Sequence, residues 1–397
     1  MTVWTRDFRL WLASRTTSVA GAEATAAVLP ILVFQQTGSA VLTGAVSAFA
    51  VLPYLCFGLF AGALADRVSR KRLMVGSDLV SAAALLSVPL AYAAGAGSTA
   101  HVLVVTFVVW AAFVWFDAAA WGALTAVVGR DGLVRANSVI WSSGVVAAIA
   151  MPAVAGVVAS AAHPSAVLAA DGVSYLVSAA LILRIRTRLT APESPREPLT
   201  RTIREGLEFI RRTPEVRVVT GAAVALTASS GAVAGMLVVH VGRDLGIGSD
   251  DWRVGLFFAA GAVGALLATV LLPVLSRRLG NGRVAVVAFA AYVPALLAVV
   301  VAGHWVVALV TWAIWFCANT LAVTNGITIR QRVTPDGLQG RVNTSVRMIA
   351  MGGTPVGALL GGVAAEGFGV RGTYLLAAVP VAVAALVLWR SPVRRLD

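Results

Sequence analysis

Two kinds of residue in this chain could do chemistry: lone acids inside long apolar stretches, and an acid within a basic turn. Glu23 and Asp117 lie in separate apolar stretches, and Trp110 precedes Asp117 by about two helical turns. A carboxyl in such surroundings can bind and release a proton, and beside an aromatic face it can help to hold a cation. The turn, residues 62–72, contains Asp66 among four basic residues and joins two apolar stretches.

The composition of the chain indicates which elements must position these residues. Of its 397 residues, 59% are hydrophobic and 12% are charged. A helix of roughly 20 apolar residues crosses the ~30 Å hydrocarbon core of a bilayer. We therefore predict an all-α membrane protein with twelve transmembrane helices, at residues 10–34, 41–65, 73–95, 101–123, 137–160, 165–185, 216–240, 252–275, 283–303, 305–328, 345–365 and 371–390.

The distribution of charge indicates the orientation of these spans. The net charge is +13, and 28 of the 31 basic residues fall in the termini and connections that share one side of the predicted spans. Arg243, Arg253 and Arg371 fall on the other side. Because cytoplasmic loops are enriched in Lys and Arg, we expect a multi-pass protein of the inner (cytoplasmic) membrane with both termini in the cytoplasm. The basic residues then set the topology, and we expect no nucleic-acid partner.

The middle of the chain predicts a division into three parts. Residues 190–198 bring three prolines into a polar stretch, a composition that breaks helices. After them, Thr202 and Glu205 fit a capping box, and Leu207 and Ile210 share the apolar face of an amphipathic helix. This helix either lies on the membrane surface or is a plain connector. The predicted parts are a six-helix bundle at 1–189, a cytoplasmic linker with the amphipathic helix at 190–214, and a second six-helix bundle at 215–397.

The two halves of the chain also repeat each other. Trp110 is followed after 21 positions by Asp131, and Trp315 is followed after 21 positions by Asp336. In both halves this acid begins an Asp-Gly turn between the fourth and fifth spans. Internal repeats of this kind build the paired bundles of many carriers, so we expect two pseudo-symmetric bundles around a central cavity.

The basic turn carries a family resemblance through Gly62, Leu64, Asp66, Arg67, Arg70 and Lys71. The chain resembles the major facilitator superfamily, whose signature between spans two and three is Gly-x-Leu-x-Asp-Arg-x-Gly-Arg-Lys. Within it, the chain is similar to the branch of multidrug, macrolide and enterobactin-type exporters through Phe116, Asp117, Asn137, Gln331, Arg332, Asp336, Gly340 and Arg341. The resemblance implies a secondary active transporter that exports a small amphipathic or toxic molecule by alternating access, driven by proton antiport.

Two motifs that proton antiporters of other branches carry are altered in this chain. Residues 101–123 contain no Arg or Lys, where those branches have an arginine early in span four. Residues 151–156 keep only the proline and one glycine of the span-five motif. An antiport mechanism therefore cannot be argued from these two motifs.

Glu23 is our first candidate for binding substrate or protons. It shares a helical face with Thr16 and Ala27, among small residues that leave room beside it. Its carboxyl would take up a proton from the outer side and release it inside, which would let a proton gradient drive export. Alternatively, Glu23 is a structural acid that is hydrogen-bonded to a neighbouring helix.

Asp117, Trp110 and Asn319 are further candidates for substrate contacts. Trp110 and Asp117 would present an aromatic surface and one acid to a cationic or amphipathic ligand, although Asp117 near a span end also fits a gate or a packing role. Asn319 belongs to an aromatic stripe on span ten, which either lines the cavity or packs against other helices. For Asp78 and Asp171, which also lie inside spans, we expect structural roles.

The gating motif consists of Gly62, Asp66, Arg67, Arg70 and Lys71. As a latch, Asp66 would pair with basic groups or helix dipoles of the opposite bundle when the cytoplasmic side is closed. Alternatively, the turn only supplies positive charge that sets orientation. We favour the latch, because orientation alone needs neither the acid nor Gly62.

Other functions fit the sequence less well. An uptake carrier for a small solute would need a hydrogen-bonding cavity, and few Asn or Gln residues occur in the spans. A non-transporting scaffold or sensor would not need the basic turn. No nucleophile, base and orienting group occur together, and Cys56 and Cys317 lack metal-ligand spacing, so we expect no enzyme, metal or cofactor. The expected partners are a small-molecule substrate, protons and the lipid bilayer, and we expect a monomer.

The substitution Asp66→Asn tests the latch. It removes the charge and keeps the shape of the side chain, so we expect transport to be abolished while membrane insertion is unchanged. The measurements are the transport rate in proteoliposomes and the amount of protein in the membrane. Transport at the wild-type rate would contradict the latch.

Overall fold

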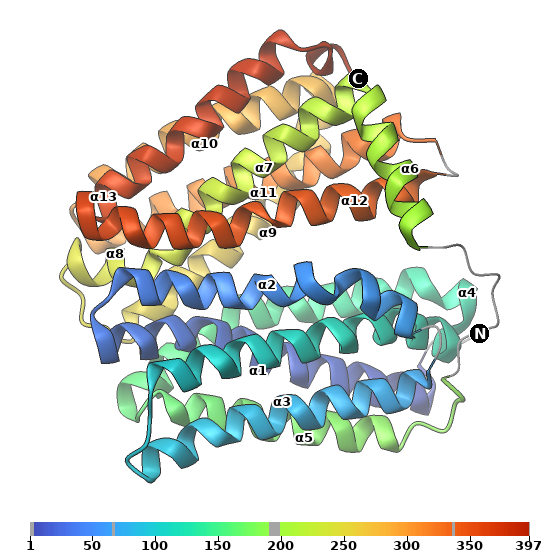
Figure 1. The fold of residues 1–397 in the computed structure, drawn as a ribbon, viewed down its shortest axis with the longest axis vertical. Coiled ribbons are helices and arrows are strands. Elements are labelled where there is room, and N and C mark those ends of the chain that lie inside the picture. The colour runs from blue at the N-terminus through green and yellow to red at the C-terminus, as the bar shows by residue number, and fades with distance from the viewer. Residues whose placement is uncertain (1–3, 66–67, 190–198, 336–337, 397) are drawn as a thin grey trace. The chain divides into compact units, whose positions relative to one another are not determined.

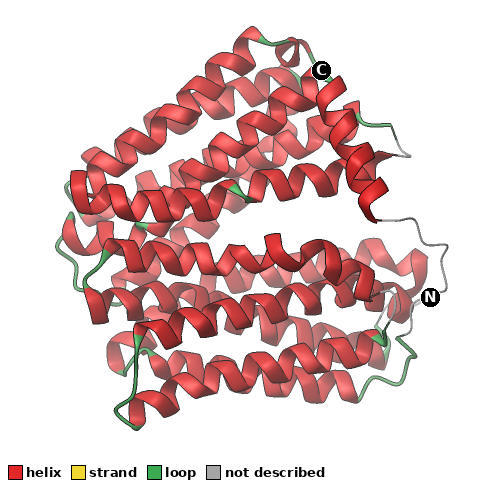
Figure 2. Cartoon of the chain, viewed as in Figure 1, coloured by secondary structure: helices red, strands yellow, loops and turns green. Residues whose placement is uncertain are grey.

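The structure is a computed structural model that describes residues 4–65, 68–189, 199–335 and 338–396. Within these residues the regular elements are helices and no strand is present (Figures 1 and 2). In chain order they are α1 (Arg6–Thr37), α2 (Ala40–Ala65), α3 (Arg70–Ala93), α4 (Thr99–Ala161), α5 (Ser165–Leu183), α6 (Leu199–Arg212), α7 (Pro214–Gly235), α8 (Leu237–Arg243), α9 (Arg253–Leu279), α10 (Asn281–Val301), α11 (Trp305–Val333), α12 (Gln339–Met351), α13 (Gly353–Arg390) and the 3-10 helix η2 (Pro392–Arg395).

Local side-chain chemistry sets several helix ends. The Thr5 hydroxyl accepts a hydrogen bond from the Phe8 N–H at the start of α1, and Ser98 accepts one from the His101 N–H at the start of α4. These caps satisfy N–H groups that have no partner inside the helix. Gly38 ends α1 with φ 60°, a left-handed conformation that glycine adopts without steric cost.

Eleven helical segments among the described residues are long and apolar enough to cross a membrane. Two of them lie in α4, because Gly129 has φ 67° and ψ 173° and interrupts the helix. The last segment, Arg341–Arg390, has 50 residues. As a straight helix it would be about 75 Å long, more than twice the ~30 Å hydrocarbon core.

Gly369 interrupts that last segment. It has φ 70° and ψ 170°, and the ribbon of α13 changes direction along its length (Figure 1). Divided at this glycine, the segment would supply two spans. The predicted number of twelve depends on that division and stays a prediction.

The chain divides into two compact units. Unit 1 comprises Met1–Gly38, Phe49–Ser194 and Ser249–Ala259, and unit 2 comprises Ser39–Ala48, Pro195–Gly248 and Ala260–Asp397. Each unit therefore includes a short segment from the other half of the sequence. The domain limits predicted at 189 and 215 stay a prediction, because residues 190–198 lie outside the described residues.

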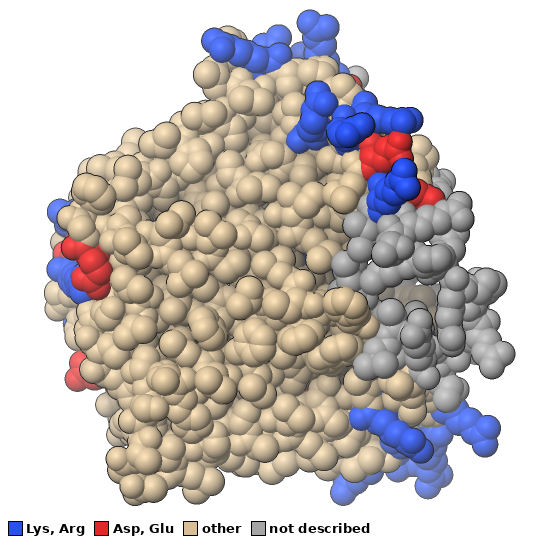
Figure 3. Space-filling model, viewed as in Figure 1, with Lys and Arg blue, Asp and Glu red and all other residues tan. Residues whose placement is uncertain are grey.

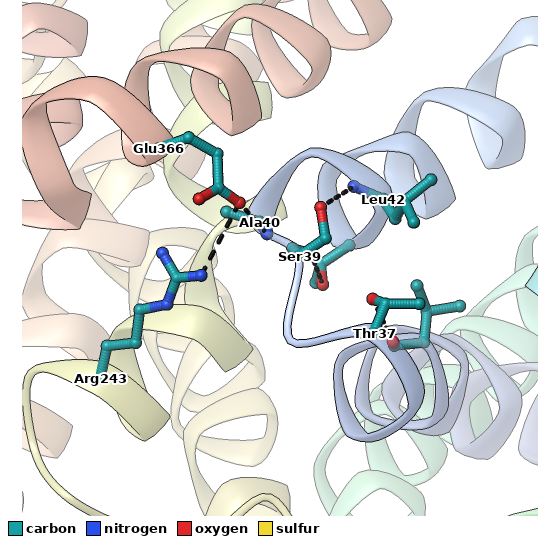
Figure 4. Close-up of polar contacts among 8 residues, drawn as sticks. Thr37, Ser39, Ala40, Leu42, Arg243 and Glu366 are labelled. Atoms are coloured by element: carbon teal, nitrogen blue, oxygen red, sulfur yellow. Dashed lines mark hydrogen bonds and ion pairs between the residues drawn. The ribbon is translucent and has the colours of Figure 1, made fainter.

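The start of α2 is held within unit 2 by a carboxylate (Figure 4). Glu366 of α13 accepts a hydrogen bond of 2.8 Å from the Ala40 N–H and lies 3.7 Å from the Arg243 guanidinium. A negative charge at a helix N-terminus is stabilised by the free N–H groups and the helix dipole. Close packing adds to this contact, because a Cβ atom on Gly44 would meet the Ala358 carbonyl oxygen of α13.

Helix α6 is the amphipathic helix that the sequence predicts, and it packs against α12. Ile210 is buried in a cluster with Val342 and Val346, while Leu207 on the same side is 44% exposed. The α6–α12 contact also includes an ion pair between Glu205 and Arg341. One part of the apolar face of α6 is thus covered by protein. A role at the membrane surface stays a prediction.

Most charged side chains on the face of the molecule drawn in Figure 3 lie toward helix ends. On the face shown in Figure 3, Lys and Arg gather near the ends of the helices, and the middle of the helices presents no charge. Arg211 and Arg212, for example, lie in the last turn of α6. This is the pattern that a helix crossing an apolar layer requires, because its charged residues must reach the polar surroundings.

Small residues bring α7 and α13 into close contact in unit 2. A Cβ atom on Gly357 would collide with the carbonyl oxygen of Ala228, and one on Gly231 would collide with that of Thr354. Small residues at helix contacts let backbones approach, and dispersion contacts then hold membrane helices together.

The substitution Gly357→Val tests this contact. Overpacking typically costs about 1–3 kcal/mol, so we expect a lower melting temperature of the detergent-solubilised protein. Gly367→Val is the matched control on the same helix, because Gly367 is exposed and a Cβ atom there meets no atom within 4 Å. Equal melting temperatures for the two variants would contradict the close contact.

Candidate functional site

An ion pair joins α1 to α4 in unit 1. The Arg15 Nη2 atom lies 2.6 Å from Asp117 Oδ1, and the Trp121 indole N–H donates to Asp117 Oδ2 at 3.2 Å. The Arg15 guanidinium also lies 5.6 Å from the ring centroids of Phe113 and Phe116, within cation–π range. Because Asp117 is already paired, its charge is balanced by the protein. This geometry favours a packing role for Asp117 over a direct ligand contact.

The other two candidates for substrate contacts, Trp110 and Asn319, lie in different units. Trp110 is half-buried in unit 1 and makes an edge-to-face contact with Phe113, with ring centroids 5.5 Å apart. In unit 2, the Asn319 side-chain oxygen accepts a hydrogen bond of 2.6 Å from the Ser230 hydroxyl. Trp312, which lies seven residues before Asn319 on α11, is 2% exposed. The buried ring of Trp312 packs between helices, and Asn319 links α11 to α7. Their contacts with substrate stay predictions.

Two acids in unit 1 are fully buried and hydrogen-bonded. The Ser178 hydroxyl donates to Asp78 at 2.6 Å, and Ser178 also lies 2.9 Å from the Ser14 hydroxyl. Asp171 accepts hydrogen bonds from the Thr25 hydroxyl and from the Ser174 hydroxyl. These contacts connect α1 to α5, and through Asp78 to α3. Both acids therefore have the surroundings of a structural group.

Glu23 differs from these acids because no partner holds it. It is half-buried on α1, and its carboxyl makes no hydrogen bond or ion pair with the described residues. Three and seven residues earlier on the same face, Ala20 and Thr16 line a hollow of about 580 Å³. The other wall of this hollow is the second segment of α4, where Ser138 and Ser143 are among the lining residues. A free carboxyl one turn from a hollow can exchange a proton or meet a ligand.

The gating motif is only partly described by the structure. Gly62 lies in α2, Arg70 begins α3, and Asp66 and Arg67 lie outside the described residues. The Lys71 ammonium donates hydrogen bonds of 2.8 Å to the carbonyl oxygens of Leu183 and Ile185 at the end of α5.

A cation on these terminal carbonyls is stabilised by the helix dipole. The Arg70 N–H also donates to the Leu189 carbonyl oxygen. The described part of the turn therefore packs on the end of α5, and the latch formed by Asp66 stays a prediction.

Arg15 is the residue of this region that the sequence does not single out. By charge counting it belongs with Arg6 and Arg9 on one side of the membrane. In the structure its side chain is 14% exposed and reaches α4. The available signal was its position as the sixth residue of the first predicted span, where an unpaired cation is costly.

The described residues hold no group of three or more His, Cys, Asp or Glu side chains placed to bind a metal ion. In unit 1, Asp117 is paired, Asp78 and Asp171 are hydrogen-bonded, and Glu23 is single, and all four lie in apolar helices. This combination defines a class: a multi-pass helical membrane protein with charged groups inside its bundles, as in membrane transporters.

Comparison with known proteins identifies the family. The family model for transmembrane secretion effectors matches residues 5–397, and the chain belongs to this family of major facilitator superfamily transporters. It is 27% identical to the multidrug efflux pump Tap of Mycolicibacterium fortuitum, over 96% of this chain and 95% of that protein. It is 46% identical to macrolide efflux protein A of Streptococcus pyogenes over 50 residues, 13% of this chain and 12% of that protein.

A solved structure agrees on the fold. The nucleoside transporter NupG matches with a TM-score of 0.77 at 14% identity, covering 98% of each chain. At this identity the likeness shows the fold alone. The family match and the efflux relatives thus confirm the predicted superfamily and the resemblance to its exporter branch, and the family is one of transporters rather than enzymes.

Neutralising either partner of the Arg15–Asp117 pair should destabilise the protein. Arg15→Gln and Asp117→Asn each leave one charge half-buried without its partner, so we expect each to lower the melting temperature. The double variant should lose less than the sum, with a coupling free energy of about 0.5–3 kcal/mol in chemical unfolding. The exposed pair Glu208 and Arg212 is the control, with an expected coupling below about 0.5 kcal/mol. Additive effects at positions 15 and 117 would refute this pairing.

Proposed function

We propose that the protein exports a small amphipathic or toxic molecule across the cytoplasmic membrane, driven by protons that move inward. The observation that carries the proposal is the carboxyl of Glu23, which has no partner among the described residues and lies one turn beyond the hollow between α1 and α4. A transporter that exchanges protons needs a group that changes protonation as access alternates between the two sides.

The relatives support the direction of transport. Tap is a multidrug efflux pump by name, and its similarity extends over nearly the whole of both chains. Macrolide efflux protein A matches a shorter region at higher identity. These similarities favour efflux over uptake, and the substrate of this chain is taken to be amphipathic because the hollow beside Glu23 combines Val146 and Met151 with serine hydroxyls.

The distribution of charge supports the proposed topology. With 28 of the 31 basic residues on one side, both termini would lie in the cytoplasm. That arrangement needs an even number of spans. If the Arg341–Arg390 segment is divided at Gly369, the eleven segments become twelve spans. The partners would be the substrate, protons and the bilayer, with the protein acting as a monomer and without nucleic acid.

Segments exchanged between the units support a mechanism with moving parts. Ser39–Ala48 belongs to unit 2 although the rest of α2 belongs to unit 1, and Ser249–Ala259 belongs to unit 1. In unit 1, a Cβ atom on Gly156 would lie 3.0 Å from the Gly255 Cα atom, so α4 and the start of α9 are in close contact. We expect the two units to move as access alternates, with such glycine contacts holding each unit together during the movement.

The substitution Glu23→Gln tests the proposed proton coupling. The amide keeps the size of the side chain but cannot exchange a proton. We expect the initial rate of gradient-driven uptake into inverted vesicles to fall at least about tenfold, a rate loss typical for removing a group that transfers protons. The assay uses cationic, neutral and anionic fluorescent amphiphiles with an imposed pH gradient. Exchange of labelled for unlabelled substrate without a gradient is measured on the same vesicles.

Asp250→Asn is the matched control, because Asp250 is an exposed acid in a connection between helices. We expect it to behave as the wild type does. Loss of gradient-driven uptake with retained exchange would assign proton coupling to Glu23. Unchanged uptake in Glu23→Gln would exclude that role, and loss of both activities would indicate a structural acid.

A further inference from the structure

A second hollow lies inside unit 2, among α7, α10, α11, α12 and α13. Its volume is about 370 Å³, within the ~300–1,000 Å³ range of small-molecule sites. Most of the surrounding side chains are apolar, and they include Ala222, Leu226, Phe289, Ala322, Met351 and Leu388. This part of the hollow fits a hydrocarbon group.

One side of the hollow is cationic. Arg330, in the last turn of α11, lines it and is 8% exposed. Its guanidinium makes no hydrogen bond or ion pair with the described residues, and its Nε atom is fully buried without a partner. The dipole at the end of α11 favours a positive charge, but it leaves the N–H donors of the guanidinium unused. A buried guanidinium with free donors is a receptor for an anion.

Further polar groups surround this charge. Asn343 and Arg347 of α12 line the same hollow and are exposed. Arg330 and Asn343 also line an adjoining hollow of about 250 Å³, together with Gln331, Thr334 and Gln339. The buried guanidinium therefore lies between an apolar space and a polar one.

We propose that unit 2 binds an amphiphile with an anionic head, its carboxylate or phosphate on Arg330 and its hydrocarbon part in the hollow beside α7 and α10. An anionic head would satisfy the free donors of Arg330 bidentately, and Asn343 could donate a further hydrogen bond. A cationic amphiphile would be repelled by Arg330 and Arg347, and a neutral one would leave the buried charge without a partner. This site involves neither Glu23 nor the hollow of unit 1, so it does not depend on the proposed proton coupling.

Binding to the purified full-length protein in a neutral detergent tests the site. The probes are phosphatidylglycerol, a membrane lipid, and dodecanoate, a soluble amphiphile. Phosphatidylcholine and dodecanol are the counterparts without net negative charge, and inorganic phosphate is the head alone. We expect at least one anionic amphiphile to bind about tenfold more tightly than its counterpart, because hydrogen bonds to a charged group contribute that much. Binding of phosphatidylglycerol would identify the ligand as a membrane lipid, and binding of dodecanoate would identify it as a soluble amphiphile.

Two pairs of variants locate the site. Arg330→Gln should weaken binding of the anionic amphiphile about tenfold, whereas Arg278→Gln, an exposed arginine at the end of α9, should not. Ala223→Leu fills the apolar hollow and should weaken binding, whereas Gly221→Leu adds the same side chain at an exposed position of α7 where a Cβ atom meets nothing within 4 Å.

Several results would overturn the proposal. Equal binding of charged and neutral amphiphiles would show that Arg330 holds no head group. Wild-type affinity in Arg330→Gln or in Ala223→Leu would place the ligand elsewhere. Inorganic phosphate binding as tightly as dodecanoate would exclude the apolar hollow. If Arg330→Gln does not fold, the comparison of probes and the Ala223→Leu and Gly221→Leu pair still decide the outcome.

Discussion

A charged side chain among apolar helices has to be paired or hydrogen-bonded, because leaving it alone in a membrane costs several kcal/mol. Because of this constraint, α1 has polar contacts that lead to three other helices of unit 1. Its Arg15 pairs with Asp117 of α4, and its Thr25 donates to Asp171 of α5. Its Ser14 joins the hydrogen bonds around Asp78 of α3. The few polar residues of the interior therefore fix which helices are neighbours, and apolar packing fills the space between them.

Glycine contacts supply the second constraint on the fold. Membrane helices gain little from the hydrophobic effect when they associate, so close backbone approach and dispersion take its place. Gly357 against Ala228 fixes α13 on α7, and Gly156 against Gly255 fixes the start of α9 on α4. Gly156 is the one glycine kept from the altered span-five motif. Its contact with α9 gives a physical reason for a small residue at that position.

The sequence predicts the helices well, because each span is a local property of some 20 residues, and the breaks occur at glycines or polar turns. Charge counting predicts the orientation of the spans from the sequence alone, and that orientation stays a prediction. The contacts that sequence analysis misses are those between residues far apart in the chain. Arg15 and Asp117 are separated by 102 residues, and no pattern within either span predicts that they meet. The same holds for Arg330, which by sequence is one more basic residue at the end of a span, and whose burial follows only from the packing of five helices.

The surroundings of Glu23 explain why it can stay without a partner where other acids cannot. Around the neighbouring hollow, α1 presents Thr16 and Ala20, and the facing segment of α4 presents Ser142 and Ser143. These side chains are short, and none of them donates a hydrogen bond to the Glu23 carboxyl. The nearby hydroxyls have partners of their own, since Thr16 bonds to Ser143 and Ser142 bonds to the backbone. A carboxyl in such a place is stabilised most simply by a proton or by a ligand that enters the hollow, which is a requirement for a group that must change state in each transport cycle.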